Sequence, residues 1–155
     1  MAETASLREI VSAQMKEAMK SGEKTRVGAL RLIMSALKDR EIEARGAGKI
    51  VSRADELALL TKMAKSRQES LDIYRANGRD ELAAQESAEI AVINEFLPKQ
   101  MDEVAINDAA RAAIAEVGAA GVRDMGKVVT ALKAKYPGQM DFARASAIVK
   151  GLLSA

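Results

Sequence analysis

The chain has 155 residues, of which 48% are hydrophobic and 30% are charged, and this balance supports a folded core and argues against disorder. Cysteine and histidine are both missing, which excludes disulfides, the commonest zinc ligands and the side chains most used in nucleophilic and general-base catalysis at neutral pH. The net charge of +2 is uneven, because residues 1–54 hold 11 Lys and Arg against 7 Asp and Glu, whereas residues 55–97 hold 5 against 9. A basic segment beside an acidic one can present an anion-binding face, or the acidic segment can simply solvate itself.

The first two predicted elements are amphipathic helices. Ser6 and Glu9 have the spacing of a capping box, apolar residues recur after them at helical intervals, and Gly22 can end the helix in a left-handed cap. The second helix extends from about Glu23 towards Arg45.

Charged residues interrupt the first apolar positions of the chain, which is unlike a signal peptide, and no uncharged apolar stretch is long enough to cross a membrane. These observations predict a cytoplasmic protein.

Two further helices are predicted before a hinge. Ser52 and Asp55 begin a long third helix, which ends at an Asn-Gly pair. Asp80 is the predicted N-cap of a fourth helix, and Pro98 stops it because proline cannot continue a helix. Residues 1–97 are therefore predicted to form a four-helix bundle domain.

Beyond the hinge the sequence has more alanine and glycine and fewer charges. Three shorter helices are predicted, with aspartate caps at Asp102, Asp124 and Asp141. Gly118 ends the first of them, and a Tyr-Pro-Gly turn precedes the third. No alternating strand pattern is present, so the expected fold class is all-α, with a three-helix tail module over residues 98–155.

Several stretches of the chain resemble the GatB/YqeY family, in order and with their spacings intact. The first stretch is Leu30–Met34 with Ala36–Lys38, and the second is Lys65–Ser70 with Tyr74, Gly78 and Arg79. The third stretch contains Glu86, Glu89 and Ile90 with Phe96–Met101. The fourth is Asp124–Val129 with Tyr136–Gly138. The resemblance implies the stand-alone YqeY-like form, in which a helical bundle precedes a tail domain. A related tail stands at the C-terminus of the B subunit of the glutamine-dependent amidotransferase that acts on misacylated Glu-tRNA and Asp-tRNA, where it is associated with holding tRNA.

The resemblance links the chain to carbon–nitrogen ligase chemistry with glutamine as amido-N-donor. The kinase-like cradle that activates the carboxylate in that enzyme has no counterpart here, and the Gly/Ser-rich stretch of its glutaminase partner is also missing. Ser66 and Ser70 instead flank Arg67 and Glu69 on a predicted helix. We therefore expect no catalytic residues, no cofactor and no activity of the chain on its own.

The tail contains the residues that we expect to bind nucleic acid. A helix that begins near Asp124 offers free backbone N–H groups and a positive dipole end to a phosphate, and a glycine permits close approach. The predicted contact residues are Arg123, Gly126, Lys127, Lys133, Lys135, Arg144 and Lys150. The alternative interpretation is an ordinary N-cap at Asp124, with Gly126 admitting a neighbouring helix and the basic side chains merely solvated.

A second group of charged residues lies in the bundle segment. Its members are Arg31, Lys65, Arg67, Glu69, Arg79, Glu86 and Glu89. Arg31 is unusual because it interrupts a run of apolar residues, and the group could bind an anion. We favour a structural ion network between helices, with i,i+4 pairs such as Lys65–Glu69. Glu86 and Glu89 lie three apart on one helical face, and ion pairing explains them better than general acid–base catalysis.

The favoured function is that of a tRNA-associated binding or adaptor protein, whose tail recognises the backbone and shape of tRNA rather than its sequence. The expected partners are tRNA and an aminoacyl-tRNA synthetase or amidotransferase, with no membrane and no metal. The alternatives are a protein–protein adaptor without RNA binding, whose grooves receive a partner helix, and a true enzyme.

Overall fold

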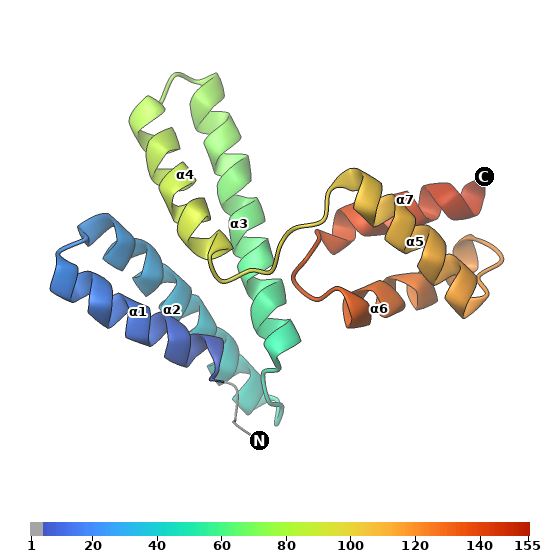
Figure 1. Ribbon diagram of the computed structural model, residues 1–155, viewed down its shortest axis with the longest axis horizontal. Coiled ribbons are helices and arrows are strands. Elements are labelled where there is room, and N and C mark those ends of the chain that lie inside the picture. Colours follow the sequence, from blue (N-terminus) through green and yellow to red (C-terminus); the bar gives the residue numbers. More distant parts are fainter. Residues whose placement is uncertain (1–4) are drawn as a thin grey trace. The chain divides into compact units, whose positions relative to one another are not determined.

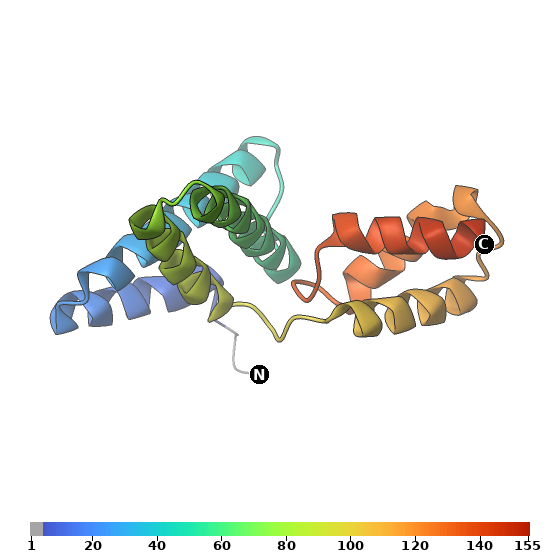
Figure 2. The ribbon, with the colours of Figure 1, turned by 90° about the horizontal axis from the view of Figure 1, so that it is seen from above.

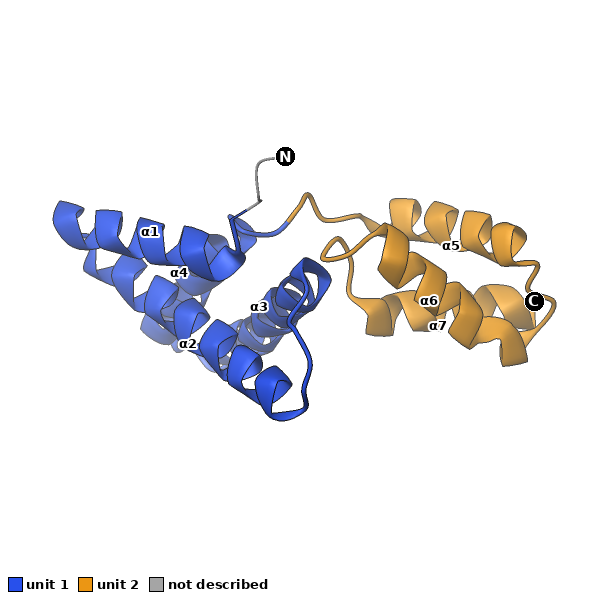
Figure 3. Cartoon of the chain, turned by 90° about the horizontal axis from the view of Figure 1, so that it is seen from below, with its two compact units in different colours: residues 1–97 blue, residues 98–155 orange. Residues whose placement is uncertain are grey.

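The computed structural model describes residues 5–155 (Figure 1). This part of the chain contains seven α-helices, one short 3-10 helix and no strand, which confirms the all-α fold class. The helices are α1 (Leu7–Ser21), α2 (Lys24–Gly46), α3 (Arg53–Ala76), α4 (Asp80–Asn94), α5 (Glu103–Val117), α6 (Met125–Lys135) and α7 (Phe142–Ser154), and the 3-10 helix η1 covers Val122–Asp124. The chain divides into two compact units (Figure 3), which are unit 1, Met1–Leu97 with α1–α4, and unit 2, Pro98–Ala155 with the remaining helices.

Short-range sequence signals place several helix ends as predicted. Ser6 and Glu9 form a capping box at the start of α1, and Ser52 and Asp55 form another at the start of α3. Gly22, with a φ of 73°, ends α1 in the left-handed conformation that glycine adopts without strain. Each cap satisfies backbone groups that a helix end leaves without an intrahelical partner.

One predicted cap is wrong, and a second is correct in position only. Asp80 lies in the first turn of α4 rather than before it, because Arg79 occupies the cap position and no side chain caps this end. Asp124 precedes α6 with φ −90° and ψ 2°, which is not the extended conformation of a capping residue, since η1 runs directly into the helix. The Asp124 carboxylate instead accepts a hydrogen bond from the backbone N–H of Ala120, at 2.9 Å.

Unit 1 consists of two helical hairpins, in which α1 lies beside α2 and α3 lies beside α4 (Figures 1 and 2). The hairpins meet because α2 also contacts α3 and α4. On α2, the buried Leu30, Ile33 and Leu37 recur at the spacing of one helix face. The buried side chains of the whole core cluster are Leu7, Val11, Ala18, Leu30, Ile33, Leu37, Leu57, Leu60 and Ile93. Each large aliphatic side chain stabilises the fold by about 1.5–3 kcal/mol through burial.

Unit 2 consists of α5, α6 and α7, which contact one another pairwise. Its core is rich in alanine, which lets the helices approach closely, and contains Ile106, Ala109, Ala110, Ala113, Val128, Leu132, Met140, Ala145 and Val149. The segment that follows Leu97 is anchored to the turn before α7. The side chain of Gln100 donates to the carbonyl oxygen of Gly138 at 2.7 Å, and the N–H of Met101 donates to the carbonyl of Gln139 at 2.8 Å.

Candidate binding site

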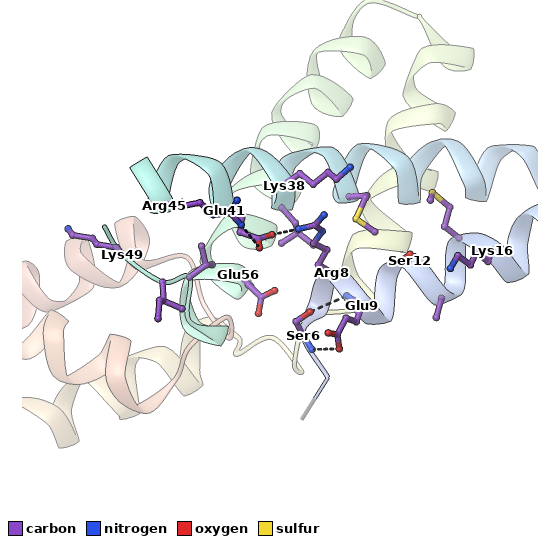
Figure 4. Close-up of a pocket in the computed structure, with 16 residues that line it drawn as sticks. Ser6, Arg8, Glu9, Ser12, Lys16, Lys38, Glu41, Arg45, Lys49 and Glu56 are labelled. Carbon is purple, nitrogen blue, oxygen red and sulfur yellow. Dashed lines mark hydrogen bonds and ion pairs between the residues drawn. The ribbon is translucent and has the colours of Figure 1, made fainter. Parts of the chain in front are cut away.

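A groove of about 940 Å³ lies in unit 1, between α1, the C-terminal half of α2, the loop that follows α2 and the start of α3 (Figure 4). Its floor is apolar and includes Met15, Met34 and Leu37, which also belong to the core of unit 1 or pack against it. Charged side chains surround this floor. The basic ones are Arg8, Lys16, Lys38, Arg45 and Lys49, and the acidic ones are Glu9, Glu41 and Glu56. The lining therefore has a net positive charge.

One ion pair crosses this groove from α1 to α2, and a second lies within α2. Nη1 of Arg8 donates to Oε2 of Glu41 at 2.5 Å, and Nη2 of Arg45 lies 3.7 Å from the other oxygen of the same carboxylate. The side chains of Arg8 and Glu41 are 41% and 39% exposed. Pairs with this exposure contribute about 1 kcal/mol or less to stability, because water screens them. Their main effect is to orient Arg8 and to engage both oxygens of Glu41 (Figure 4).

Glu56 is the buried carboxylate of the groove. It comes from the first turn of α3, and the residue is only 8% exposed. Burial raises the pKa of Glu56, and this effect exceeds the lowering by Arg53, whose Nε lies 3.5 Å away, and by the backbone N–H groups of Leu7 and Arg8. The contacts tie the start of α3 to the positive N-terminal end of α1.

The groove presents charge and apolar surface rather than an activated nucleophile. Its two hydroxyls belong to Ser6 and Ser12, and the Ser6 hydroxyl accepts the capping hydrogen bond from the backbone N–H of Glu9 at 3.2 Å. Glu41 is held by two guanidinium groups. Nucleophilic catalysis needs a base positioned on the attacking group, whereas ion pairs beside an apolar floor suit the binding of a partner.

From the predicted ion group, the structure brings together Arg67 of α3 and Glu89 of α4. Nε of Arg67 lies 3.2 Å from Oε2 of Glu89, and the two side chains are 20% and 13% exposed. The N–H of this Nε does not point at an acceptor, so the contact is an ion pair without a well-aligned hydrogen bond. Oε2 of Glu86 is also buried, and it accepts no hydrogen bond from the residues that the structure describes.

The remaining predicted members of the ion group lie at the surface, and they are Arg31, Lys65, Glu69 and Arg79. Arg31 is exposed because Leu30 and Ile33 take the inward positions of α2, so the two residues between them point outward. Arg31 forms no ion pair within residues 5–155 and stands outside the network.

All seven residues predicted to bind nucleic acid are exposed on unit 2. Arg123 lies in η1, Gly126, Lys127, Lys133 and Lys135 lie on α6, and Arg144 and Lys150 lie on α7. Two of these residues are paired with carboxylates of α5. Nζ of Lys135 lies 3.7 Å from Glu116, and Nη2 of Arg144 lies 2.7 Å from Glu103.

Gly126 is not required for helix packing. A Cβ atom added at this position meets no atom within 4 Å, so the interpretation that Gly126 admits a neighbouring helix is wrong. Next to it, the hydrogen bond from the N–H of Ala120 lowers the pKa of Asp124, and Lys127 and Arg123 lower it further. An anion at the start of α6 therefore meets a carboxylate as well as basic side chains.

The groove residues Arg8, Glu41 and Glu56 were not predicted from the sequence. Glu56 carries a signal that could have been used, because it lies one helical turn before the buried Leu60, on the apolar face of α3, where a carboxylate needs partners. Arg8 and Glu41 carry no such signal. They are 33 positions apart, and only the pairing of α1 with α2 brings them together.

Within residues 5–155, no helix is both long and apolar enough to cross a membrane. Nor does this part of the chain contain a group of three or more acidic side chains that could hold a metal ion.

Helices in two compact units, without a strand in the described residues, define the class of the protein as small and all-α. The chain belongs to the Yqey-like protein family, whose model matches residues 8–153. The match confirms the family that the sequence motifs indicate, and it extends over both units.

The chain is also similar to proteins named "Altered inheritance of mitochondria protein 41, mitochondrial". The protein of Candida glabrata is 38% identical over 86 residues, which make up 54% of this chain and 45% of that protein. The protein of Saccharomyces cerevisiae is 30% identical over 91 residues, which make up 57% of this chain and 46% of that protein. The chain thus spans less than half the length of these relatives.

Proposed function

We propose that this chain is a tRNA-associated binding protein, an adaptor without a catalytic centre of its own. In this proposal residues 98–155 form a three-helix tail domain that holds the phosphate backbone of tRNA. Residues 1–97 form a helical bundle domain that docks on a protein partner, an aminoacyl-tRNA synthetase or an amidotransferase, in the cytoplasm.

The observation that carries the proposal is the separation of charge among the helices of unit 2. α6 and α7 contain five basic side chains and no acidic one, whereas α5 contains three carboxylates and one arginine. The five basic residues are Lys127, Lys133, Lys135, Arg144 and Lys150. Helices with charge of one sign attract a polyanion and release its counterions on binding.

The ion pairs with α5 leave these basic side chains available. In the pair Arg144–Glu103 the side chains are 56% and 65% exposed, and in the pair Lys135–Glu116 they are 56% and 61% exposed. Pairs this exposed contribute about 0–1 kcal/mol, so a phosphate oxygen can replace the carboxylate with little loss of stability. The pairs therefore hold the basic groups at the surface without neutralising them permanently.

Recognition of the backbone fits unit 2 better than recognition of bases. Its aromatic residues are Tyr136 and Phe142, and both pack against the core of the unit. Nζ of Lys133 lies 6.0 Å from the centre of the Phe142 ring, and Nζ of Lys135 lies 5.7 Å from that of Tyr136. Rings that are packed and covered in this way offer little surface on which a base can stack.

The family resemblance supports the link with tRNA. The tail resembles the domain that holds tRNA in the amidotransferase B subunit, while the carbon–nitrogen ligase chemistry with glutamine as donor belongs to other parts of that enzyme. We therefore expect no conversion of Glu-tRNA to Gln-tRNA when this chain is incubated alone with glutamine or ammonia. Turnover that a single substitution abolishes would contradict the proposed lack of a catalytic centre.

Filter binding of total tRNA to the full chain over a series of salt concentrations tests the proposal. Each phosphate contact adds about −0.7 to −0.9 to the slope of log affinity against log salt concentration. We expect retention of tRNA at low salt, and a slope that is shallower by about one contact for each charge removed in the double variant Lys127→Gln and Lys150→Gln.

The double variant Lys99→Gln and Arg111→Gln is the matched control, because it removes the same charge from unit 2 outside α6 and α7. An equal change of slope in both double variants would contradict the placement of the contact. No retention at low salt would contradict the proposal itself and favour an adaptor without RNA. Partners recovered from an RNase-treated lysate would then identify what that adaptor binds.

A further inference from the structure

The groove of unit 1 combines an apolar floor with an exposed apolar edge. Met15 and Met34 are half-buried, because they pack against the core while lining the groove. Ile50, in the loop after α2, is 93% exposed at its edge. Methionine-lined surfaces adapt to the side chains of a partner helix, and burial of an exposed isoleucine favours association.

The charge that remains in this groove is positive. Glu41 is engaged by two arginines, and Glu56 is buried beside Arg53. Lys16 and Lys38 are exposed and form no ion pair within residues 5–155. A carboxylate brought by a partner would therefore meet cations that are not already paired.

The same surface continues along α2. A smaller depression of about 360 Å³ shares Arg8, Lys38 and Glu41 with the groove. It adds Ile42, which is 66% exposed. Ile42 and Ile50 thus add two exposed apolar positions to this surface. Among its charges without an ion pair in the described residues, the basic Lys16, Lys38 and Lys49 outnumber the acidic Glu9 and Asp39.

We propose that this groove is the docking site for an acidic amphipathic helix of a protein partner. The apolar stripe of that helix covers the methionine floor and Ile50, and its carboxylates face Lys16 and Lys38. RNA fits this lining less well, because the groove contains no aromatic side chain on which a base could stack. Its apolar floor also has no side chain that could bind a phosphate. This docking rests on the proposed role of residues 1–97 as the domain that docks on a protein partner, and it does not require the tRNA contact of unit 2.

A display library of helical peptides tests the proposal with the full-length chain as target. Each peptide carries leucine at positions i, i+3, i+4 and i+7, and its outward positions are randomised among Glu, Lys and Ser. We expect selection to enrich Glu over Lys at the outward positions. The most enriched peptide is then synthesised with a fluorescent label, and its affinity is measured by anisotropy in the absence of RNA.

The double variant Lys16→Glu and Lys38→Glu should weaken this peptide about tenfold or more, since it reverses two charges at the rim. The substitution Ile50→Ser should weaken it as well. The matched control is Lys62→Glu with Arg75→Glu, which reverses the same charge at exposed positions of α3 outside the groove. We expect the control to bind the peptide as the unaltered chain does.

Four outcomes would overturn the proposal. They are no enrichment of Glu, equal weakening by the control, displacement of the peptide by excess tRNA, and dimerisation that the Lys16→Glu and Lys38→Glu variant abolishes. Displacement would assign the groove to RNA, and dimerisation would assign it to a second copy of the chain. Because the peptide is measured without RNA, a failure of the tRNA proposal leaves this result unaffected.

Discussion

Arg67 on α3 and Glu89 on α4 form an ion pair across the second hairpin, with 3.2 Å between Nε and Oε2 and side chains 20% and 13% exposed. The pair Arg144–Glu103 in unit 2 is closer, at 2.7 Å, but its side chains are 56% and 65% exposed. Charges that lose their hydration on folding depend on their partner, whereas exposed charges keep water as an alternative. We therefore expect the loss of the Arg67–Glu89 pair to lower stability more than the loss of the closer Arg144–Glu103 pair.

Replacing Glu89 with alanine should lower the free energy of unfolding by about 1–3 kcal/mol, because it leaves a largely buried guanidinium without its carboxylate. Replacing Glu103 with alanine should lower it by less than about 1 kcal/mol. Urea unfolding followed by circular dichroism measures both. Equal losses would contradict the role of burial.

Glu56 should make stability fall as the pH rises. Burial raises its pKa above the ordinary value of 4.5, so the folded chain holds this proton more tightly than the unfolded chain. The contribution to stability is fully present below the ordinary pKa and is lost as the pH rises through the raised one. Glu56→Gln should therefore be more stable than the unaltered chain at about pH 7 and lose this advantage below about pH 4.5. An advantage that does not change with pH would contradict this assignment.

Asp55, the neighbouring residue, should show the opposite sign. Its hydrogen bond with the backbone of Ser52 in the capping box lowers its pKa below 3.8. The resulting stability is present above pH 3.8 and is lost as the pH falls through the lowered pKa. Asp55→Asn should lower the free energy of unfolding at neutral pH by about 0.5–2 kcal/mol, with a smaller loss in acid. Chemical denaturation at several pH values compares the two neighbours directly.

Replacing Gly126 with alanine should stabilise the fold and at the same time weaken the retention of tRNA. The position is helical and open, so alanine should raise the free energy of unfolding by about 0.5–1 kcal/mol. If a phosphate approaches the backbone here, the added methyl should weaken tRNA retention in the more stable variant. Gly22→Ala is the contrasting change, because a φ of +73° strains any other residue, and it should destabilise by about 1 kcal/mol without affecting tRNA. Unchanged retention for Gly126→Ala would exclude a close backbone contact.

The fold could be predicted as far as it depends on local signals. The capping boxes at Ser6 and Ser52 and the glycine end at Gly22 each act within a few residues, so their spacing reveals them. The cap predicted at Asp80 is wrong because this residue already lies in the first turn of α4. Asp124 does occupy the cap position of α6, but its backbone is not extended and its side chain does not cap the helix, because η1 runs directly into α6.

The groove could not be predicted because it depends on contacts between distant segments. Arg8 and Glu41 belong to different helices, and nothing in either local sequence indicates the other. The sequence predicts Arg31 in an ion network because it interrupts an apolar run. Leu30 and Ile33 take the inward positions of α2, however, so Arg31 points outward and does not join the network within the described part of the chain.

Ultraviolet crosslinking of the full-length chain in cells, with sequencing of the bound RNA and mass spectrometry of the crosslinked peptides, tests the central claim most directly. The proposal predicts that tRNA dominates the recovered RNA and that the crosslinked peptides come from α6 and α7. Absence of RNA, or crosslinks confined to residues 5–97, would contradict it.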